Sequence, residues 1–397
     1  MTRVAIFTDN DFEKVNGVTT TLKAVLRCAP PDVVARLYTM SDREVTTREY
    51  RAHRSVGVGL PRYPEMRIHW PRLGALSRAF WRDGADVAHI TTPGPVGLAA
   101  RYLARRHRRP MIGSFHTNLG DYARALGRGG ALGRVVGRGL DDYMRWLYRA
   151  CDRVLVPSHE TRMDLIDQGY APQQLAVWTR GVDAEQFSPA RRSRSRRASW
   201  GVSDDVPVLL YAGRLSREKR LDRLVELVAA LGVRDVRYRL VIAGDGPMRS
   251  ELRLRLPHAH FCGAVAHDEM GSLMASADVF VFPSDTDTFG NVVLEAQASG
   301  LPAVVSSEGG PRGAIVDGVS GFVCIDGQVR QFAHHVSRLL EDASLRRQCA
   351  IEARRQAQQR DWSEALAPLY QHWRESAARV TRADRVRSLP WPASELL

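Results

Sequence analysis

Lysine is scarce in this 397-residue chain, which has only Lys14, Lys23 and Lys219 although lysine and arginine together number 57. Cysteine is scarce too, and the five widely separated cysteines give neither a disulfide framework nor the spacing of a metal site. We therefore expect a reducing compartment, the cytoplasm. No apolar run approaches the roughly 18 residues that a membrane span needs. The opening residues, MTRVAIFTD, are typical of a strand and not of a signal peptide.

The glycine pattern GxGxxG is also missing after every expected strand, so dinucleotide binding is unsupported. Positive charge, by contrast, is in excess, with a formal net charge of +13. Residues 1–183 carry 28 basic residues against 18 acidic ones, whereas the remainder carries 29 against 26. Such a basic first half favours anionic partners: a phospholipid surface, nucleic acid or an acidic acceptor. An equally simple interpretation is that arginine decorates solvated faces.

Length and composition indicate a two-domain α/β protein. A chain of 397 residues is too long for one hydrophobic core, and 44% hydrophobic with 25% charged residues is typical of a globular protein. Apolar strands alternate with helical patterns in both halves. The expected parts are a first domain at 1–185, a basic solvated linker at 186–204, a second domain at 205–362, a helix at 363–385 and a loose tail at 386–397.

One stretch of the second half, residues 277–311, combines all the elements of a ligand site. Residues 278–282 alternate β-branched and aromatic side chains, which predicts a buried strand. A polar loop follows at 284–288. From Phe289 the apolar spacing becomes helical, and Gly300 ends the helix. A strand, a loop and a helix N-terminus together form an anion site, because the unpaired N–H groups and the dipole of the helix point at the loop.

Three residues of this stretch favour a phosphorylated sugar. Gly290, in the first turn, lets a ligand approach the backbone closely. Asp287 on the loop and Glu295 about two turns into the helix place two carboxylates beside that turn. A second loop at 308–311 follows the next strand and should face the same crevice. This arrangement is suited to holding a sugar diphosphate.

The segment DTFGNVVLE resembles the carboxylate–seven residues–Glu signature of glycosyltransferase family 4, whose members are retaining enzymes of the GT-B fold. The longer segment TDTFGNVVLEA resembles the branch of bacterial α-mannosyltransferases that use GDP-mannose and lipid-linked acceptors. Position 287 carries Asp where the family usually has Glu, and that branch often shows Asp there. Taken alone, Asp287 or Thr288 would fit an ordinary helix cap equally well.

Further family motifs occur in family order over nearly the whole chain. VNGV at 15–18 matches the loop after the first strand, His116-Thr117 the strand-end histidine, and GVDAEQFSP at 181–189 the inter-domain signature. Arg214 and Lys219 match the pair that clasps the donor phosphates. The resemblance implies an α/β GT-B fold: two Rossmann-like domains facing each other across a cleft, with a C-terminal helix that crosses back to the first.

The resemblance also implies roles for individual residues. Catalytic roles are expected of His116, Asp287, Arg214 and Lys219. Donor contacts are expected of Gly17, Arg214, Lys219, Gly244, Gly263, Val265, Phe289, Gly290, Asn291 and Glu295. Acceptor contacts are expected of Asn16, Gly17, Tyr63, Arg67, His116 and Thr117.

In the implied reaction the bond from the anomeric carbon to the diphosphate breaks while Arg214, Lys219 and helix N–H groups neutralise the leaving group. We therefore expect no metal, no cofactor and no acidic triplet of the DxD type at the site. The α configuration is retained, by a front-side attack in which the leaving phosphate oxygen takes the acceptor's proton. Asp287 then holds sugar hydroxyls, Glu295 the ribose and His116 the sugar.

The segment at 60–73, LPRYPEMRIHWPRL, mixes basic and aromatic residues and suits a membrane interface or an anionic acceptor. A proline-broken loop at the edge of the domain fits equally well. The glycine- and arginine-rich residues 127–139, followed by an amphipathic helix at 140–150, are expected on the acceptor side. We expect a cytoplasmic protein, peripheral at the inner face of the cell membrane, that acts on a lipid-linked or glycan acceptor and binds no nucleic acid.

Three other functions fit the same sequence. A family 4 enzyme could use a UDP-sugar, with glucose, N-acetylglucosamine or sulfoquinovose as the transferred group. A GT-B epimerase would bind nucleotide sugars but would need carboxylates acting as acid and base. A non-catalytic nucleotide-sugar-binding protein would have lost its cleft residues, whereas Arg214, Lys219 and Glu295 are present.

Overall fold

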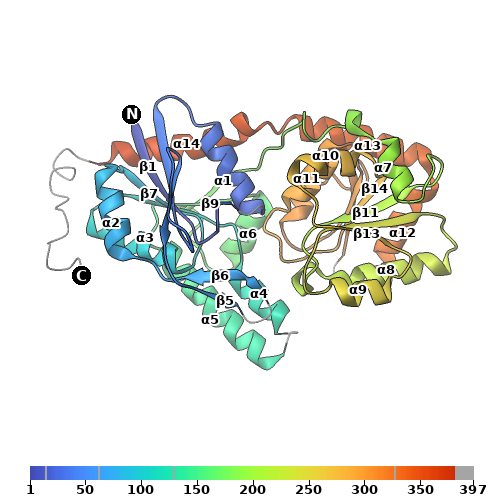
Figure 1. Ribbon diagram of the computed structural model, residues 1–397, viewed down its shortest axis with the longest axis horizontal. Helices are drawn as coiled ribbons and strands as arrows, with labels where there is room; N and C mark the ends of the chain where they lie inside the picture. The colour runs from blue at the N-terminus through green and yellow to red at the C-terminus, as the bar shows by residue number, and fades with distance from the viewer. Residues whose placement is uncertain (14–15, 61–62, 128–129, 326–327, 381–397) are drawn as a thin grey trace. The chain divides into compact units, whose positions relative to one another are not determined.

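The computed structural model describes residues 1–13, 16–60, 63–127, 130–325 and 328–380. The chain divides into two compact units, each an α/β body with helices beside its strands (Figure 1). Unit 1 comprises residues 1–120, 136–179 and the described chain from 365, and unit 2 comprises residues 121–135 and 180–364.

Unit 1 alternates strands and helices along the chain. In order, its elements are β1 (Thr2–Phe7), α1 (Gly17–Arg27), β2 (Val33–Ser41), β3 (Val45–Thr46), β4 (Tyr50–Arg54), β5 (Gly57–Leu60), β6 (Tyr63–His69), α2 (Leu73–Arg82), β7 (Val87–Ile90), α3 (Pro95–Arg106), β8 (Met111–Ser114), α4 (Leu119–Leu126), α5 (Ala131–Tyr148), β9 (Arg153–Val156), α6 (His159–Asp167), β10 (Leu175–Val177) and α14 (Trp362–Ala378). Three of these helices, α4, α5 and α14, cross the boundary with unit 2.

The large sheet of unit 1 has the strand order β10-β9-β8-β7-β1-β2-β4-β3, and every neighbouring pair is parallel except β3 with β4. All residues of β7 and of β8 are buried, as expected for strands that helices cover on both faces. Strand order reverses between β1 and β7. Ligands of such sheets bind outside the carboxyl ends of the strands at that reversal.

Two segments of unit 1 differ from the sequence-based expectations. Strands β5 and β6 pair as a separate antiparallel hairpin, with Val58 opposite Ile68, so the alternative of a proline-broken loop is wrong for these strands. The expected helix at 140–150 begins at Ala131 instead, since residues 131–139 are already helical in α5.

The last helix, α14, completes unit 1, as expected for a C-terminal helix that returns to the first domain. The buried Tyr370 hydroxyl donates a hydrogen bond to the backbone oxygen of Val25 at 2.9 Å. The Arg374 guanidinium pairs with both oxygens of Asp32, at 2.7 and 2.9 Å. A helix more than 330 residues later in the chain therefore packs against α1 and the start of β2.

Unit 2 repeats the α/β pattern. In order, its elements are η1 (Pro189–Arg191), α7 (Arg194–Ser199), β11 (Val208–Ala212), η2 (Arg217–Lys219), α8 (Leu221–Val233), β12 (Arg239–Ala243), α9 (Arg249–Arg255), β13 (His260–Gly263), α10 (His267–Ala275), β14 (Val279–Phe282), α11 (Asn291–Ala298), β15 (Ala303–Ser306), η3 (Gly310–Ala314), β16 (Gly321–Cys324), α12 (Val329–Glu341) and α13 (Ala343–Gln358).

The sheet of unit 2 is wholly parallel with the order β13-β12-β11-β14-β15-β16, which is that of a Rossmann fold. In Figure 1, α8 and α9 lie on one side of these strands and α10 and α11 on the other. The strand order reverses between β11 and β14. The loops that follow these two strands are therefore the expected place for a ligand.

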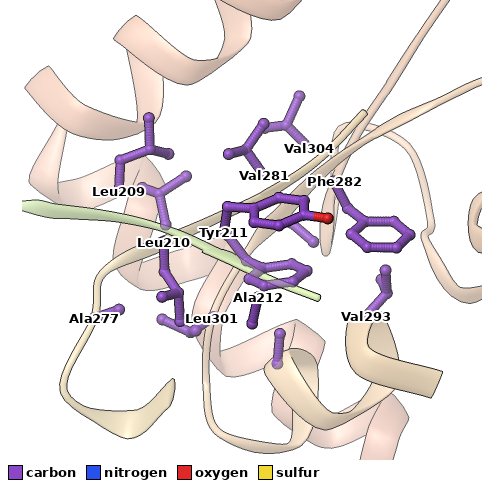
Figure 2. Close-up of a cluster of buried hydrophobic side chains, with 14 of the residues drawn as sticks. Leu209, Leu210, Tyr211, Ala212, Ala277, Val281, Phe282, Val293, Leu301 and Val304 are labelled. Atoms are coloured by element: carbon purple, nitrogen blue, oxygen red, sulfur yellow. The ribbon is translucent and has the colours of Figure 1, made fainter. Parts of the chain in front are cut away.

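An aromatic and aliphatic core fixes β11 against β14. Tyr211 and Phe282 stack with ring centroids 6.1 Å apart and an interplanar angle of 13° (Figure 2). Both rings are fully buried, as are Val281 and Val293 in the same cluster. Burial of one such side chain stabilises the fold by roughly 1.5–3 kcal/mol. The core therefore holds the carboxyl ends of β11 and β14 rigidly together.

The basic tract at 191–197 is not simply a solvated linker. Its Arg197 is 1% exposed, and its guanidinium donates to Asp278 Oδ2 at 2.9 Å and to the backbone oxygens of Ser276, Ser203 and Val206. The expectation of a solvated linker is wrong for this residue. A buried cation needs such a full set of acceptors, because an unpaired one would be costly.

Candidate active site

A glycine stands at or directly after the end of each of the first three strands of unit 2, and backbone hydrogen bonds join these strand ends. Gly213 N donates to Ala243 O at 3.0 Å, and Gly244 N donates to Gly263 O at 2.7 Å. Gly244 has φ +133°, and a Cβ there would lie 1.9 Å from the backbone oxygen of Gly213. Only glycine fits this close approach. The expected donor residues Gly244 and Gly263 are thus joined by a backbone hydrogen bond at the carboxyl edge of the sheet.

An ion pair joins the loops after β11 and β14, where the strand order reverses. Lys219 Nζ, from η2, donates to Asp287 Oδ1 at 2.6 Å and to Oδ2 at 2.8 Å. The two side chains are 12% and 19% exposed. The lysine and the carboxylate that the sequence singled out separately are therefore direct partners in the ligand-free protein.

A second set of contacts fastens the same two loops beside this pair. Asp285 Oδ2 accepts from Arg220 at 2.7 Å and from Arg223 at 3.3 Å. The Thr286 hydroxyl donates to the backbone oxygen of Glu218 at 3.0 Å. The expectation of a site without an acidic triplet is wrong, because Asp285-Thr286-Asp287 has the DxD spacing. Both of its carboxylates, however, already have basic side chains as partners.

Lys219 lies in an environment that keeps it charged. Burial of the ammonium opposes protonation, but the neighbouring Asp287 carboxylate outweighs burial and raises the pKa of Lys219 above its usual range. The ammonium also lies 5.9 Å from the centre of the Phe282 ring, within the range of a cation–π contact. The site thus holds a permanent compact cation, of the kind that suits a phosphate oxygen.

The helix α11 directs its N-terminus at the same place. Gly290 is the N-cap residue with φ +75°, and as a glycine it has no side chain with which to cap this helix. A Cβ on Gly290 would lie 2.9 Å from Pro311 Cγ, so the loop at 308–311 packs against the first turn. Gly310 N donates to Asp287 O at 2.7 Å, which holds that loop against the Asp287 backbone. The expected anion site thus has its predicted elements: strand, loop and helix N-terminus.

Glu295 lies within α11 and is half-buried. Desolvation by burial raises the pKa of its carboxyl group to about 7. A carboxyl group in this state gains from an incoming donor such as a ribose hydroxyl, which would stabilise its charged form. The expected ribose contact is therefore chemically consistent, although it stays a prediction.

Apart from Gly17, which begins α1 in unit 1, the remaining expected donor residues lie in unit 2. The phenol of Tyr211, itself fully buried, donates to the backbone oxygen of Arg214 at 3.0 Å and fixes the loop after β11. Phe289 is 3% exposed and packs in the core of this unit, so its side chain supports the loop rather than lining an open surface. Asn291 opens α11, and Val265 follows β13 with a half-buried side chain.

One residue near the ion pair was not expected from the sequence. Tyr122, on α4, belongs to unit 2 and lies close enough to feel the charges of Lys219, Asp287, Glu218 and Arg214. Lys219 lowers the pKa of its phenol, but burial and the two carboxylates outweigh this effect and raise the pKa. The only available signal was its place six residues after His116, near a strand end. That signal does not indicate a contact with residues almost 100 positions later.

The expected acceptor residues lie in unit 1. Asn16 caps α1: its side-chain oxygen accepts from Val18 N and Thr19 N, each at 3.0 Å, and Thr19 Oγ1 accepts from Asn16 N at 2.9 Å. Gly17 is the first residue of that helix. Capping of α1 by Asn16 thus explains part of the sequence match of this loop. An acceptor contact at this loop stays a prediction. Val15 lies outside the described residues.

His116 and Thr117 follow β8 at the carboxyl edge of the sheet of unit 1, as expected. The imidazole packs edge-on against Trp178, with ring centroids 5.8 Å apart. Arg67, on β6, pairs with Asp42 at 2.5 Å and donates to Gly57 O at 2.7 Å. Its charge is therefore paired with Asp42, which directly follows β2, and only its bond to Gly57 lies within the hairpin. The side chain of Tyr63 lies outside the described residues.

Asp9 occupies the strand-order reversal of unit 1. Its carboxylate accepts from Thr92 Oγ1 at 2.6 Å and from Val96 N, in the first turn of α3, at 2.8 Å. Burial raises the pKa of Asp9 although these hydrogen bonds counteract the effect. A Cβ on Gly94 would lie 2.5 Å from this carboxylate. An acidic side chain of the protein itself thus fills the anion site of this helix.

Two Rossmann-like units in one chain, with a candidate phosphate site at the strand reversal of the second, define the GT-B class of glycosyltransferases. A solved structure of the same class supports this: Anabaena Alr3699/HepE in complex with UDP superimposes with a TM-score of 0.73 at 18% identity, over 94% of this chain and all of that chain. A family model described as "Glycosyltransferase Family 4" matches residues 15–186, and one described as "Glycosyl transferases group 1" matches residues 193–356.

The chain belongs to glycosyltransferase family 4. It is 32% identical to a GDP-mannose-dependent alpha-mannosyltransferase of Mycobacterium tuberculosis (strain CDC 1551 / Oshkosh), over 96% of this chain and 98% of that protein. It is also 32% identical to the sulfoquinovosyl transferase SQD2 of Arabidopsis thaliana, over 72% of this chain and 55% of that protein. The expected family, the GT-B fold and glycosyltransferase activity are confirmed.

In the part of the chain that the structure describes, no helix has the length and hydropathy that a membrane span requires. In the same part of the chain, no group of three or more His, Cys, Asp or Glu side chains has the arrangement of a metal site.

Proposed function

We propose that this glycosyltransferase is a retaining α-mannosyltransferase that moves mannose from GDP-mannose to a lipid-linked or glycan acceptor. The observation that carries the proposal is the meeting of Lys219 and Asp287 where the strand order of unit 2 reverses. A cation for phosphate and a carboxylate for sugar hydroxyls are thus adjacent. The choice of mannose is supported by the 32% identity to a mannosyltransferase over nearly the full chain.

In the proposed reaction, the bond between the anomeric carbon and the phosphate oxygen of the donor breaks first. Lys219, Arg214 and the N-terminus of α11 stabilise the charge that develops on the leaving diphosphate. The acceptor oxygen then forms its bond to the anomeric carbon on the same face, which retains the α configuration. Its proton moves to the departing phosphate oxygen. His116 contacts the sugar in this proposal.

Calorimetry with five ligands tests the donor: GDP, UDP, GDP-mannose, UDP-glucose and UDP-N-acetylglucosamine. We expect GDP and GDP-mannose to bind at least tenfold more tightly than the uridine ligands, with transfer of mannose to an extract of membrane lipids. Binding of UDP at least as tight as that of GDP would contradict the mannose proposal and would favour the UDP-sugar alternative. Recovery of an epimerised nucleotide sugar instead of a glycosylated product would favour an epimerase.

The proposed site needs no metal, because Lys219 and Arg214 supply the positive charge and both carboxylates of the DxD-spaced triplet have basic partners. Turnover should therefore survive dialysis against EDTA unchanged. Loss of turnover that manganese or magnesium restores would contradict this part of the proposal.

We propose further that the β5–β6 hairpin meets an anionic membrane. Its cross-strand pair Val58 and Ile68 is 60% and 41% exposed, and the following Trp70 is 67% exposed. Two exposed arginines flank the hairpin in the chain: Arg54 precedes β5 and Arg72 follows β6, and Arg72 donates to the backbone oxygen of Arg54 at 3.4 Å. Apolar side chains among basic ones suit the interface of an anionic bilayer, where each basic residue contributes about 1 kcal/mol.

Liposome flotation tests the hairpin. Wild-type protein should float with phosphatidylglycerol vesicles at low salt and not with neutral vesicles, and Val58→Ser with Ile68→Ser should reduce the floated fraction severalfold. Ile351→Ser is the matched control, because Ile351 is 65% exposed on α13 in unit 2. Equal recovery with both kinds of vesicle, or an equal effect of the control, would show that the surface charge has no such partner.

A further inference from the structure

The ion pair between Lys219 and Asp287 places two expected functions in conflict. Lys219 Nζ has three N–H bonds, and in the ligand-free protein it donates to both carboxylate oxygens of Asp287, at 2.6 and 2.8 Å. The proposed function needs the same ammonium for the donor diphosphate and the same carboxylate for sugar hydroxyls. Neither group can serve its ligand fully while both of these hydrogen bonds persist.

We propose that donor binding is an anion exchange on Lys219, in which the diphosphate displaces Asp287 and thereby releases the Asp287 carboxylate to bind the sugar. The inference rests on the proposed function of this site. It assigns Asp287 a second role, that of the counter-ion that holds Lys219 in place until the donor arrives.

Burial explains why a counter-ion is needed. The Lys219 side chain is only 12% exposed, and a buried cation without a partner destabilises a protein strongly. Asp287 compensates this charge with one negative charge. A diphosphate brings more negative charge and additional oxygens to the same ammonium, and α11 begins close by, with its N-cap at Gly290 in the same loop as Asp287. Replacing Asp287 on Lys219 therefore lowers the free energy only when the ligand carries a strongly charged phosphate group.

The exchange couples two recognition events. A sugar without the diphosphate meets an Asp287 that is engaged with Lys219, so it gains little from this carboxylate. A diphosphate without the sugar leaves the freed Asp287 without a hydrogen-bond donor. Only the complete nucleotide sugar satisfies both groups, which favours the intact donor over its fragments.

The neighbouring Asp285 provides a matched control. It lies two residues from Asp287 in the same loop, and it pairs with Arg220 and Arg223 rather than with Lys219. Asp285→Asn therefore weakens the fastening of the loop without removing the counter-ion of Lys219. Asp287→Glu provides a second control, because it keeps the competing negative charge.

The test is calorimetry of the full chain with inorganic pyrophosphate and with GDP. Removal of the competing anion in Asp287→Asn should tighten pyrophosphate binding five- to tenfold, whereas Asp287→Glu and Asp285→Asn should stay within twofold of the wild type. Ligand-free Asp287→Asn should also melt several degrees lower and should gain more in melting temperature from pyrophosphate than the wild type does. This thermal measurement reports on the variant even if calorimetry is prevented by poor yield.

Unchanged or weaker pyrophosphate binding by a folded Asp287→Asn protein would overturn the exchange. It would show that Asp287 only positions Lys219. A wild-type protein that binds neither pyrophosphate nor GDP would instead contradict the proposed function itself, so the two failures can be told apart. Tightening by Asp285→Asn equal to that by Asp287→Asn would also overturn the exchange, because it would point to a general loosening of the loop.

Discussion

Both units have a sheet whose strand order reverses, but the acidic side chain beside that reversal has a different partner in each unit. In unit 1, the Asp9 carboxylate accepts a hydrogen bond from Val96 N in the first turn of α3, so the protein itself occupies the anion site of that helix. In unit 2, the carboxylate beside the reversal is Asp287, on the loop after β14; it pairs with Lys219, and the N-cap residue of α11 is Gly290, which has no side chain.

This difference explains how two units of the same fold can differ in phosphate binding. A carboxylate bonded to helix N–H groups excludes a phosphate by charge and by space, whereas a carboxylate bonded to a lysine leaves a cation that a phosphate can take over. We infer that unit 2 binds the donor, because a carboxylate that a phosphate can displace holds Lys219 at its strand reversal.

The largest effect should come from removal of the exchangeable cation. Lys219→Ala and Arg214→Ala should each lower turnover roughly 100-fold or more, because the negative charge on the leaving diphosphate would lose a stabilising partner. Lys23→Ala is the matched control, since Lys23 is an exposed lysine of unit 1. Steady-state kinetics with circular dichroism of each variant measures this. Near-normal rates in both site variants would remove these residues from the mechanism.

A pH titration should show a smaller effect, about tenfold, at Glu295. If its carboxylate accepts hydrogen bonds from the ribose, nucleotide affinity should fall about tenfold between pH 8 and pH 6, since a pKa of about 7 leaves only a small charged fraction at the lower pH. Glu295→Gln should make the affinity nearly independent of pH in this range. Calorimetry at the two pH values measures it, and an equal slope in the variant would contradict the ribose contact.

The same raised pKa predicts how stability depends on pH. Because the folded protein holds this proton more tightly than the unfolded chain does, the free energy of unfolding should decrease as pH rises from about 4.5 to about 7, by on the order of 1–3 kcal/mol. Glu295→Gln should remove that part of the decrease. Guanidinium denaturation at pH 5 and pH 8 would show it, and identical pH slopes for both proteins would exclude it.

In unit 1, the comparison predicts a change in stability without a change in donor binding. Asp9→Ala should lower the free energy of unfolding by about 1–2 kcal/mol, because α3 would lose its cap. The KM for the donor should change less than twofold. Denaturant unfolding measures the stability, and steady-state kinetics measures the KM for the donor. A large rise in this KM would show that the strand reversal of unit 1 also takes part in donor binding.

The smallest expected effect concerns Tyr122. Tyr122→Phe should raise the KM for the donor about threefold, since its phenol lies among the charges of Lys219 and Asp287 and can donate to a phosphate or sugar oxygen. Tyr102→Phe is the control, because Tyr102 is 46% exposed on α3 in unit 1. Equal kinetics in the two variants would show that the Tyr122 hydroxyl does not take part in donor binding.

The sequence by itself determined the local elements of the site. Apolar alternation indicated β14, the change to helical spacing indicated α11, and Gly290 indicated the close turn between them, because each of these signals depends only on neighbouring residues. The motif order was sufficient for the family and for the GT-B fold. Lys219 and Asp287 were each identified as candidates in the same way.

The tertiary structure alone decided which of these groups are partners. The contacts of Lys219 with Asp287, of Arg197 with Asp278 and of Asp9 with Thr92 join residues 68, 81 and 83 positions apart. Tyr122 likewise reaches the site from a helix near the boundary of the two units. Such pairings follow from the order of the strands in each sheet, and hydrophobic spacing specifies which residues are buried but not which strand lies beside which.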